Sequence, residues 1–466
     1  MQKELNIEKE KLIDTYGKDR YMKLIYKIST VQKIAEILGA AAKKVLGDRY
    51  SDKYLQTIYI PFLAQLIQAD QIRPLNRLQS PTFQNISQLL LYLWPDWHSS
   101  IFENNRKWPE GNYDIIFDNR LNIYEKYVYK LFGISYCELQ NAITEKEIVR
   151  EDFKLRSILL KYLANVNDIF SAELIVDYLP CSLFEGLLTN TNIVNYPSAK
   201  VLWLGQIHNE SYLFYLAYMK DKGVKVIAQT HGGAISQVEY IFATDISERL
   251  LSDIHHSGMW GNIYKAYPNW RASRNLFLNK KYFTYKKKQK ILVITTFFLI
   301  ESRSEHKIWY SNNITSEEFY HKRLKDLNNH FDAAFDFMAH PYQHDFDVKL
   351  SYLKSLYPDC AFIKNISVQE ASHHYDAVIH LDTWATALIE LSGTNIRQYV
   401  YLGPELLLNQ GYERFLWNNK KSSTKKECIN GCYVEVNNKK YKAAYGGSYL
   451  YPFYYARLIK KLKSQL

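Results

Sequence analysis

The sequence has no apolar run long enough to span a lipid bilayer. Its longest apolar-leaning stretch covers residues 291–300, whereas a transmembrane helix needs about 20 residues. Residues 1–8 are charged and lack the apolar core of a signal peptide. The five cysteines are spread along the chain; Cys428 and Cys432 are spaced C-x3-C, but no second pair completes a zinc site. We therefore expect free thiols and a cytoplasmic protein.

Several motifs of familiar enzyme classes are also absent. The chain contains neither the G-x-G-x-x-G loop of dinucleotide-binding domains nor the P-loop G-x-x-x-x-G-K-[ST], which argues against a dinucleotide oxidoreductase and a P-loop ATPase. It has no G-x-S-x-G elbow, which argues against an α/β-hydrolase. Hydrophobic residues make up 47% of the chain and charged residues 23%, so we expect a folded globular protein.

Positive charge, in contrast, is abundant. The net charge is +11 and lysines cluster within residues 280–290, 420–426 and 460–463. No zinc finger or aromatic RNP strand accompanies these clusters, so nucleic acid is not an expected partner. An anionic membrane surface and an acidic or phosphorylated substrate both fit this charge. For most of these lysines, a solvated surface that aids solubility is the favoured interpretation.

The 466 residues are too many for one hydrophobic core. Apolar residues at helical spacing predict a helical layer over residues 1–75. Short apolar runs then alternate with amphipathic segments, which predicts doubly wound parallel sheets in two Rossmann-like domains, residues 76–279 and 291–466, joined by a basic linker at 280–290. Such domains face a cleft that favours ligand sites. The expected strands are 113–118, 174–178, 200–205 and 224–228, then 291–296, 335–340, 360–363, 377–380 and 398–401, and a basic helix is expected over 454–466.

The most informative motif lies in the first domain. The apolar run 224–228 ends at Gln229, Thr230, His231, Gly232 and Gly233, which reads as a buried parallel strand whose carboxyl end delivers His231 into a turn. In open α/β sheets ligands bind outside the carboxyl ends of the strands, and the glycines allow the backbone to approach a ligand closely. A glycine-kinked turn with a structural histidine is the alternative interpretation.

Two strands of the second domain also end at polar residues. His340 follows a strand and precedes a proline, which fixes the turn and leaves the imidazole placed to donate to a phosphate. The spacing H-x3-H-D here invites a metal interpretation, but the proline argues against a helical i,i+4 pair, so no metal is expected. Thr295 and Thr296 end the first strand of this domain and belong to the same candidate donor set.

Hydroxyl groups follow the strand at 377–380. Thr383 and Thr386 stand at the start of a predicted helix, where free backbone amides and the helix dipole favour an anion. N-capping is the alternative role for these threonines, and both roles can coexist. Glu390, about one turn further on, either reaches a ribose hydroxyl or faces solvent. Together these residues suit transfer from a nucleotide-activated donor in the second domain to an acceptor in the first, with no metal or cofactor required.

Three stretches, residues 179–186, 229–233 and 386–396, resemble the bacterial surface-carbohydrate (O-antigen cluster) transferases with a Q-H-G-G signature, which are of the GT-B type. Thr230 is inserted into that signature here, and Arg397 stands where the family usually has proline. The chain is more distantly similar to capsule and Kdo transferases and to CDP-glycerol glycerophosphotransferases.

The resemblance implies a glycosyltransferase in which His231 is the catalytic base and His340 and the threonine hydroxyls hold the donor phosphate. The acceptor side would be formed by Gln229, Gly232, Gly233 and Glu185. The implied donor is a CMP-linked ulosonic acid such as Kdo or a sialic-like sugar, and the acceptor is a saccharide, lipid-linked or protein molecule at the inner face of the membrane. A CDP-alcohol phosphotransferase and a non-catalytic sugar- or nucleotide-binding module remain alternatives.

Overall fold

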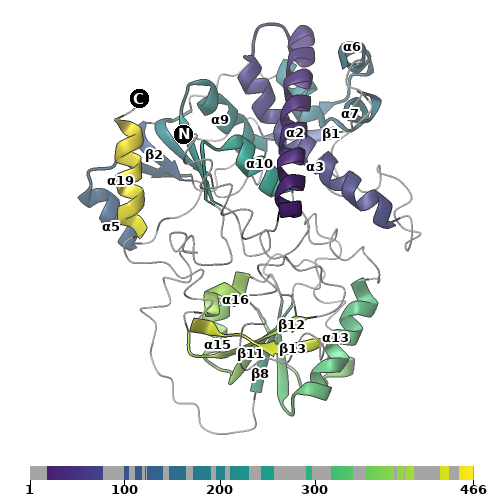
Figure 1. Ribbon diagram of the computed structural model, residues 1–466, viewed down its shortest axis with the longest axis vertical. Helices are drawn as coiled ribbons and strands as arrows, with labels where there is room; N and C mark the ends of the chain where they lie inside the picture. The colour runs from purple at the N-terminus through teal and green to yellow at the C-terminus, as the bar shows by residue number, and fades with distance from the viewer. Residues whose placement is uncertain are drawn as a thin grey trace.

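The computed structural model gives the chain an α/β fold built from parallel-rich sheets and helices (Figure 1). Two larger sheets lie in separate parts of the molecule, and a two-stranded sheet accompanies the first of them. The structure describes residues 18–76, 99–103, 111–117, 121, 123–139, 146–163, 172–189, 196–204, 210–229, 243–256, 290–295, 316–339, 353–364, 366–381, 386–392, 394–402, 431–439 and 451–464.

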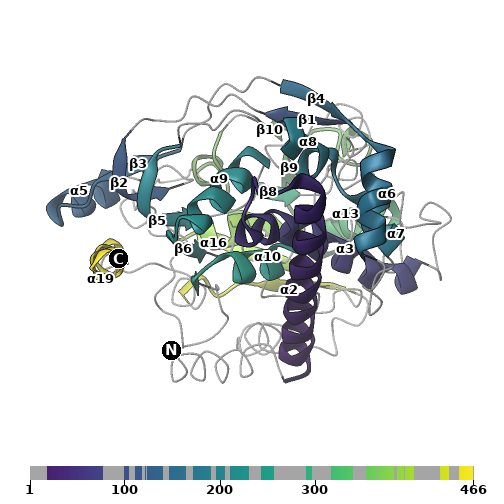
Figure 2. The ribbon, with the colours of Figure 1, turned by 90° about the horizontal axis from the view of Figure 1, so that it is seen from above.

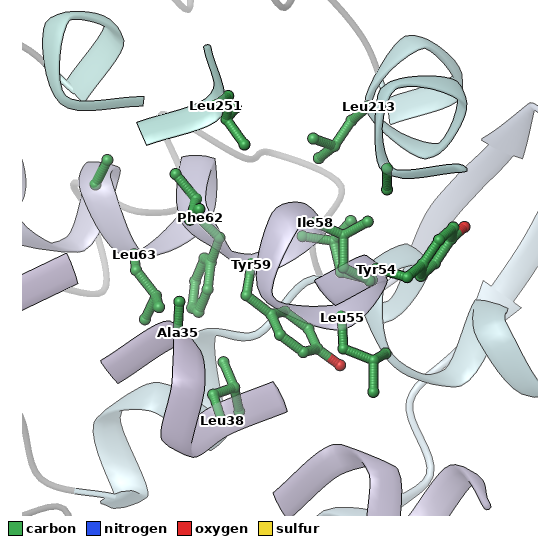
Figure 3. Close-up of a cluster of buried hydrophobic side chains, with 14 of the residues drawn as sticks. Ala35, Leu38, Tyr54, Leu55, Ile58, Tyr59, Phe62, Leu63, Leu213 and Leu251 are labelled. Atoms are coloured by element: carbon green, nitrogen blue, oxygen red, sulfur yellow. The ribbon is translucent and has the colours of Figure 1, made fainter. Parts of the chain in front are cut away.

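Two long helices, α2 (Lys18–Leu46) and α3 (Asp52–Asn76), form the expected N-terminal helical layer. Nearly all residues from 54 to 67 of α3 are buried, which is typical of a helix covered on several sides. It packs between α2 and the pair α9 (Glu210–Asp221) and α10 (Ala243–Leu251). Figure 3 shows Tyr59 and Phe62 of α3 within this cluster. The helical layer is therefore part of the core beside the first sheet.

The first large sheet has five parallel strands in the order β3-β2-β5-β6-β7. Apolar residues of its central strands are buried on both faces, as expected of parallel strands covered by helices. The strands predicted at 113–118, 200–205 and 224–228 are confirmed. The strands are β2 (Asn112–Phe117), β3 (Tyr136–Glu138), β5 (Ser198–Leu204), β6 (Lys225–Gln229) and β7 (Ile254–His256).

The segment between β3 and β5 differs from the sequence prediction. Residues 174–178, expected as a strand, lie in helix α7 (Ala172–Tyr178). The prediction was wrong because a short apolar run has no periodicity that separates a strand from a buried helix. The other elements here are an antiparallel pair, β1 (Ser99–Glu103) and β4 (Lys146–Arg150), and the helices α6 (Phe153–Leu163), η1 (Cys181–Leu183) and α8 (Glu185–Thr189).

The second large sheet has six strands in the order β10-β9-β8-β11-β12-β13, all parallel except β13. All five strands predicted for this domain are confirmed. Cys432 in β13 is disulfide-bonded, so the expectation of a free thiol was wrong for this residue; spacing alone does not reveal a pairing. The elements are β8 (Lys290–Thr295), α13 (Ser316–His330), β9 (Ala334–Ala339), β10 (Phe362–Ile363), α15 (Val368–Ser372), β11 (Ala377–His380), α16 (Thr386–Leu391), β12 (Arg397–Leu402) and β13 (Cys432–Glu435).

The C-terminal helix α19 (Tyr451–Lys463) packs against the first sheet and against α5 (Ile123–Leu131) (Figures 1 and 2). The ring of Tyr455 lies 4.5 Å from that of Trp203, centroid to centroid. The sequence predicted this basic helix correctly but grouped it with the second domain, and its contacts lie with the first. Helical periodicity identifies an apolar face and does not identify the surface that covers it.

Candidate functional site

The order of strands in the second sheet defines a topological switch point. The chain passes from β8 outward to β9 and β10 and then returns to the opposite side of β8 as β11. In doubly wound sheets, ligands bind outside the carboxyl ends of the two strands that flank such a reversal. The carboxyl ends of β8 and β11 are therefore the first place to look for a ligand site.

The register of the strands brings the candidate segments to this edge. Ile294 in β8 is paired with His380 in β11 on one side and with Met338 in β9 on the other. The amide of Leu381 donates to the carbonyl of Ile294 over 3.1 Å. Thr295, whose backbone ends β8, is paired with Ala339. Three adjacent strands therefore end side by side at one edge.

Several predicted donor residues follow these strand ends in the sequence. Thr296 comes after β8, His340 comes after β9, and Thr383 follows β11 by three residues; all three lie outside the described residues. Thr386 is the first residue of α16, and Glu390 in the same helix is half-buried. The structure thus places Thr295, Thr386 and Glu390 in their elements and shows the strand ends that precede the other three residues in the sequence, and the roles of all six side chains stay predictions.

A buried arginine lies beneath the end of β11. Arg323 in α13 is fully buried and its guanidinium donates to the carbonyl of Leu381. The guanidinium carbon also lies 4.6 Å from the centroid of the Tyr401 ring, an arrangement typical of a cation–π contact. The hydroxyl of Tyr433 donates to the Arg323 carbonyl over 2.8 Å. Sequence reasoning missed Arg323, because nothing in the pattern of α13 separates it from the surface arginines.

A second polar group lies at the end of β11. His380 is fully buried, and its Nε2 lies 2.7 Å from Oε1 of Gln398. The amide nitrogen of Gln398 donates to the Leu388 carbonyl in α16 and to Asn438. Because that amide nitrogen faces acceptors, Oε1 is the acceptor side and His380 Nε2 carries the hydrogen. The network joins β11, β12 and α16 behind the strand ends.

The first sheet positions the other half of the predicted site. β6 ends at Gln229, which is paired with His256 of β7, and Ala228 is paired with Leu204 of β5. The parallel strand that leads to the histidine motif is therefore confirmed. His231, Gly232 and Gly233 lie outside the described residues. The strand order in this sheet reverses between β2 and β5, so β6 is one strand away from the switch point.

Glu185, predicted on the acceptor side, lies in a buried ion pair. Its Oε1 is 2.6 Å from Arg156 Nε and its Oε2 is 2.9 Å from Arg156 Nη2. The Asp152 amide donates to the same Oε1 over 3.1 Å. Burial lowers the pKa of Arg156, but the hydrogen bond and the charge of Glu185 outweigh burial and raise this pKa overall. The guanidinium also donates to the carbonyls of Val176 and Leu179.

Comparisons of the chain with models of known protein families, with curated proteins and with solved structures gave no match. Within the described ranges, no three His, Cys, Asp or Glu residues gather in a way that would hold a metal ion. In the same part of the chain, no helix is both long and apolar enough to cross a membrane.

Proposed function

We propose that the protein is a GT-B glycosyltransferase that moves a sugar from a nucleotide-activated donor to a surface-polysaccharide or glycoprotein acceptor. One observation carries the proposal. The ends of β8, β9 and β11, which precede the predicted donor residues, lie side by side at the switch point of the second sheet. This is the position at which doubly wound sheets bind nucleotides.

In the proposed reaction, His231 takes the proton of an acceptor hydroxyl as that oxygen attacks the anomeric carbon of the donor sugar. The bond from this carbon to the phosphate breaks, and the nucleotide leaves with the electron pair. His340, Thr383 and Thr386 stabilise the charge on the departing phosphate. General-base catalysis requires an imidazole whose pKa is close to the working pH. The reaction as proposed needs no metal.

The donor and the location of the reaction follow from the resemblance. A CMP-linked ulosonic acid, such as Kdo or a sialic-like sugar, is the proposed donor. A saccharide, lipid-linked or protein acceptor would be used at the cytoplasmic face of the membrane. The proposed arrangement has two Rossmann-like domains facing a cleft, with the acceptor bound by the first domain and the donor by the second.

Thermal unfolding in the presence of CMP, CDP, UDP and GDP tests the donor site. A nucleotide present at 100 times its dissociation constant stabilises the native state by about 2.7 kcal/mol. We expect CMP to raise the melting temperature. His340→Ala should weaken CMP binding by about 1.5–3 kcal/mol, the range for a hydrogen bond to a charged group. His374→Ala, at an exposed position outside the site, is the control. Unchanged affinity in His340→Ala would remove this residue from the donor site.

Turnover of His231→Asn tests the proposed base. Asparagine keeps a polar side chain but does not accept a proton at neutral pH, so the rate should fall by about 10²–10⁴-fold. CMP binding and the melting temperature should stay at the wild-type values. Wild-type turnover in this variant would contradict the mechanism. Phosphorus in the acceptor product would instead indicate a CDP-alcohol phosphotransferase.

A further inference from the structure

Exposed apolar side chains gather on one helix of the first part of the molecule. Among the described residues, three of the eight large apolar side chains that are exposed belong to α5. Ile123 is 88% exposed, Tyr127 63% and Leu131 61%. They are spaced four residues apart, so they form one line along the outer face of the helix. We call these three residues the α5 stripe.

The opposite side of α5 is buried against the hydrophobic core, so the stripe belongs to a well-packed helix. Val128 and Tyr129 are buried in the cluster that covers one face of the first sheet, the face that carries Phe117 and Trp203. Tyr124 and Phe132 contact the ring of Phe453 in α19, at centroid distances of 6.5 and 5.7 Å. The exposure of the stripe is therefore a property of a fixed surface.

Exposed basic residues lie on α5 itself and on α19, the helix packed against it. α19 contains no acidic residue and ends in three lysines. The Nζ of Lys460 lies 5.3 Å from the centroid of the Phe132 ring. Phe132 directly follows Leu131 of the stripe in the chain. Lys461 and Arg457 of α19 and Lys130 of α5 are also exposed. We call Lys130, Arg457, Lys460 and Lys461 the basic rim. The acidic residue of α5, Glu125, is buried.

We propose that the α5 stripe and the basic rim form a docking surface for an anionic lipid membrane. Aliphatic side chains insert between lipid chains, and a tyrosine ring is favoured at the boundary between lipid and water. Lysine and arginine beside them are attracted by anionic headgroups. This combination complements a lipid surface on both counts. It deepens the membrane location proposed above and rests on that part of the proposed function, independently of donor chemistry.

The Ile123 end of the α5 stripe lies nearer the proposed acceptor side than the basic rim does, because Lys463, two residues after Lys461, pairs with Asp114 near the start of β2. α5 follows β2 in the chain, so it begins near the carboxyl edge of the first sheet. β6, parallel to β2 in the same sheet, ends at Gln229 on that edge. A membrane held against α5 and α19 would therefore lie along the side of the first sheet, and a membrane-bound acceptor would reach the carboxyl edge from the Ile123 end of the stripe.

Sedimentation of the full chain with phospholipid vesicles tests the surface. The wild-type protein should bind vesicles of phosphatidylcholine and phosphatidylserine at low salt and bind pure phosphatidylcholine far more weakly. The double variant Lys460→Gln/Lys461→Gln should lower the partition coefficient by about 30-fold at low salt, as expected for two lysines near an anionic surface. At high salt its difference from the wild type should shrink. Lys325→Gln/Lys354→Gln, at exposed positions of the second part, should bind like the wild type.

The apolar half of the surface has its own variant. Ile123→Ser/Leu131→Ser should lower the partition coefficient by at least about tenfold, and this loss should persist at high salt because it does not depend on charge. Phe153→Ser on α6, which removes an exposed phenyl ring elsewhere, is the matched control. Melting temperatures measured on the same samples should be unchanged, since all the replaced side chains are exposed.

Equal binding of the wild type to neutral and anionic vesicles would overturn the docking surface, and so would unchanged vesicle binding in both double variants. A third contrary result is a wild type that elutes as a dimer on gel filtration and double variants that elute as monomers with unchanged vesicle binding. The last result would assign the surface to a second copy of the chain. CMP binding, measured on the same variants, should be unchanged. If the wild type bound none of CMP, CDP, UDP and GDP, the transferase would be contradicted and the vesicle result would still stand.

Discussion

Glu185, which the sequence places at the acceptor side, contributes to the stability of the folded state through its ion pair with Arg156. Both side chains are buried, and replacing Glu185 leaves the buried Arg156 guanidinium with the acidic partner Glu151, whose Oε1 lies 3.3 Å from Nε. Glu185→Gln should therefore lower the free energy of unfolding by about 3 kcal/mol, the lower end of the range for breaking a buried pair. Urea denaturation measures the change, and Glu173→Gln at an exposed position of α7 is the control. Wild-type stability combined with lost activity in Glu185→Gln would favour the acceptor-side interpretation over a structural one.

Single residues differ in how far the sequence could identify them. Polar residues that directly follow an apolar run, such as Gln229 and Thr295, could be assigned to strand ends because the change of polarity is local. Arg323 and the pair of His380 and Gln398 could not be found in this way. Their contacts join elements that are 18 to 58 residues apart in the chain, and only the folded sheet brings them together.

Among the elements, α19 is joined to the first sheet by apolar contacts and by one ion pair. Lys463 Nζ lies 2.7 Å from a carboxylate oxygen of Asp114 at the start of β2. Burial would raise the pKa of Asp114, but hydrogen bonds from Lys463 and Ser135 outweigh burial and hold this pKa below its usual value. The carboxylate form is therefore the one that stabilises the folded state.

Replacement of Asp114 by asparagine should remove this contribution in a pH-dependent way. Because the folded pKa is the lower one, the contribution is complete above the unfolded value of about 3.9 and is lost as the pH falls through the folded pKa. We expect Asp114→Asn to lower the free energy of unfolding by about 1 kcal/mol at neutral pH. In acid the two proteins should converge. Urea denaturation at several pH values checks this, with Asp332→Asn at an exposed position as the control. A difference that persists in acid would mean that the carboxylate charge is not the cause.

The elements that the sequence predicted well share a physical property. Strands β5, β6, β8 and β9 are five to seven residues long, and each contains three or four consecutive buried residues, nearly all of them apolar; such runs stand out in any sequence. β3 and β7 have three residues each, which is too short for a periodic signal. β13 escaped prediction, and its position depends on antiparallel pairing with β12. A local run of apolar residues therefore decided which strands could be predicted: even β10, with two residues, was found because it lies within the apolar run 360–363.

At the scale of the whole molecule, the chain leaves the first sheet after β7, builds the second sheet from β8 to β13, and returns to the first sheet as α19. The boundaries predicted from the sequence, 76–279 and 291–466, assume that each part is built from one continuous stretch of the chain. They were drawn from the basic stretch at 280–290, which is a local signal. The return of α19 is a long-range feature. It depends on packing between the apolar face of this helix and one face of a sheet whose strands β2 and β5 lie more than 200 residues earlier in the chain.

This path predicts that the first part of the molecule does not fold well without α19. In a fragment of residues 1–289, apolar side chains of β2, β5 and β6 that Tyr455, Ala456, Ile459 and Leu462 help to cover would face water. A contiguous apolar patch of this kind promotes aggregation. Joining residues 445–466 to this fragment through a flexible linker restores the missing face. We expect gel filtration to show aggregates for the first fragment and a monomer for the second, which should also melt at a higher temperature. If residues 1–289 alone gave a monomer that melts at the same temperature as the linked fragment, α19 would add nothing to the first sheet, and its apolar contacts there would be incidental to the fold.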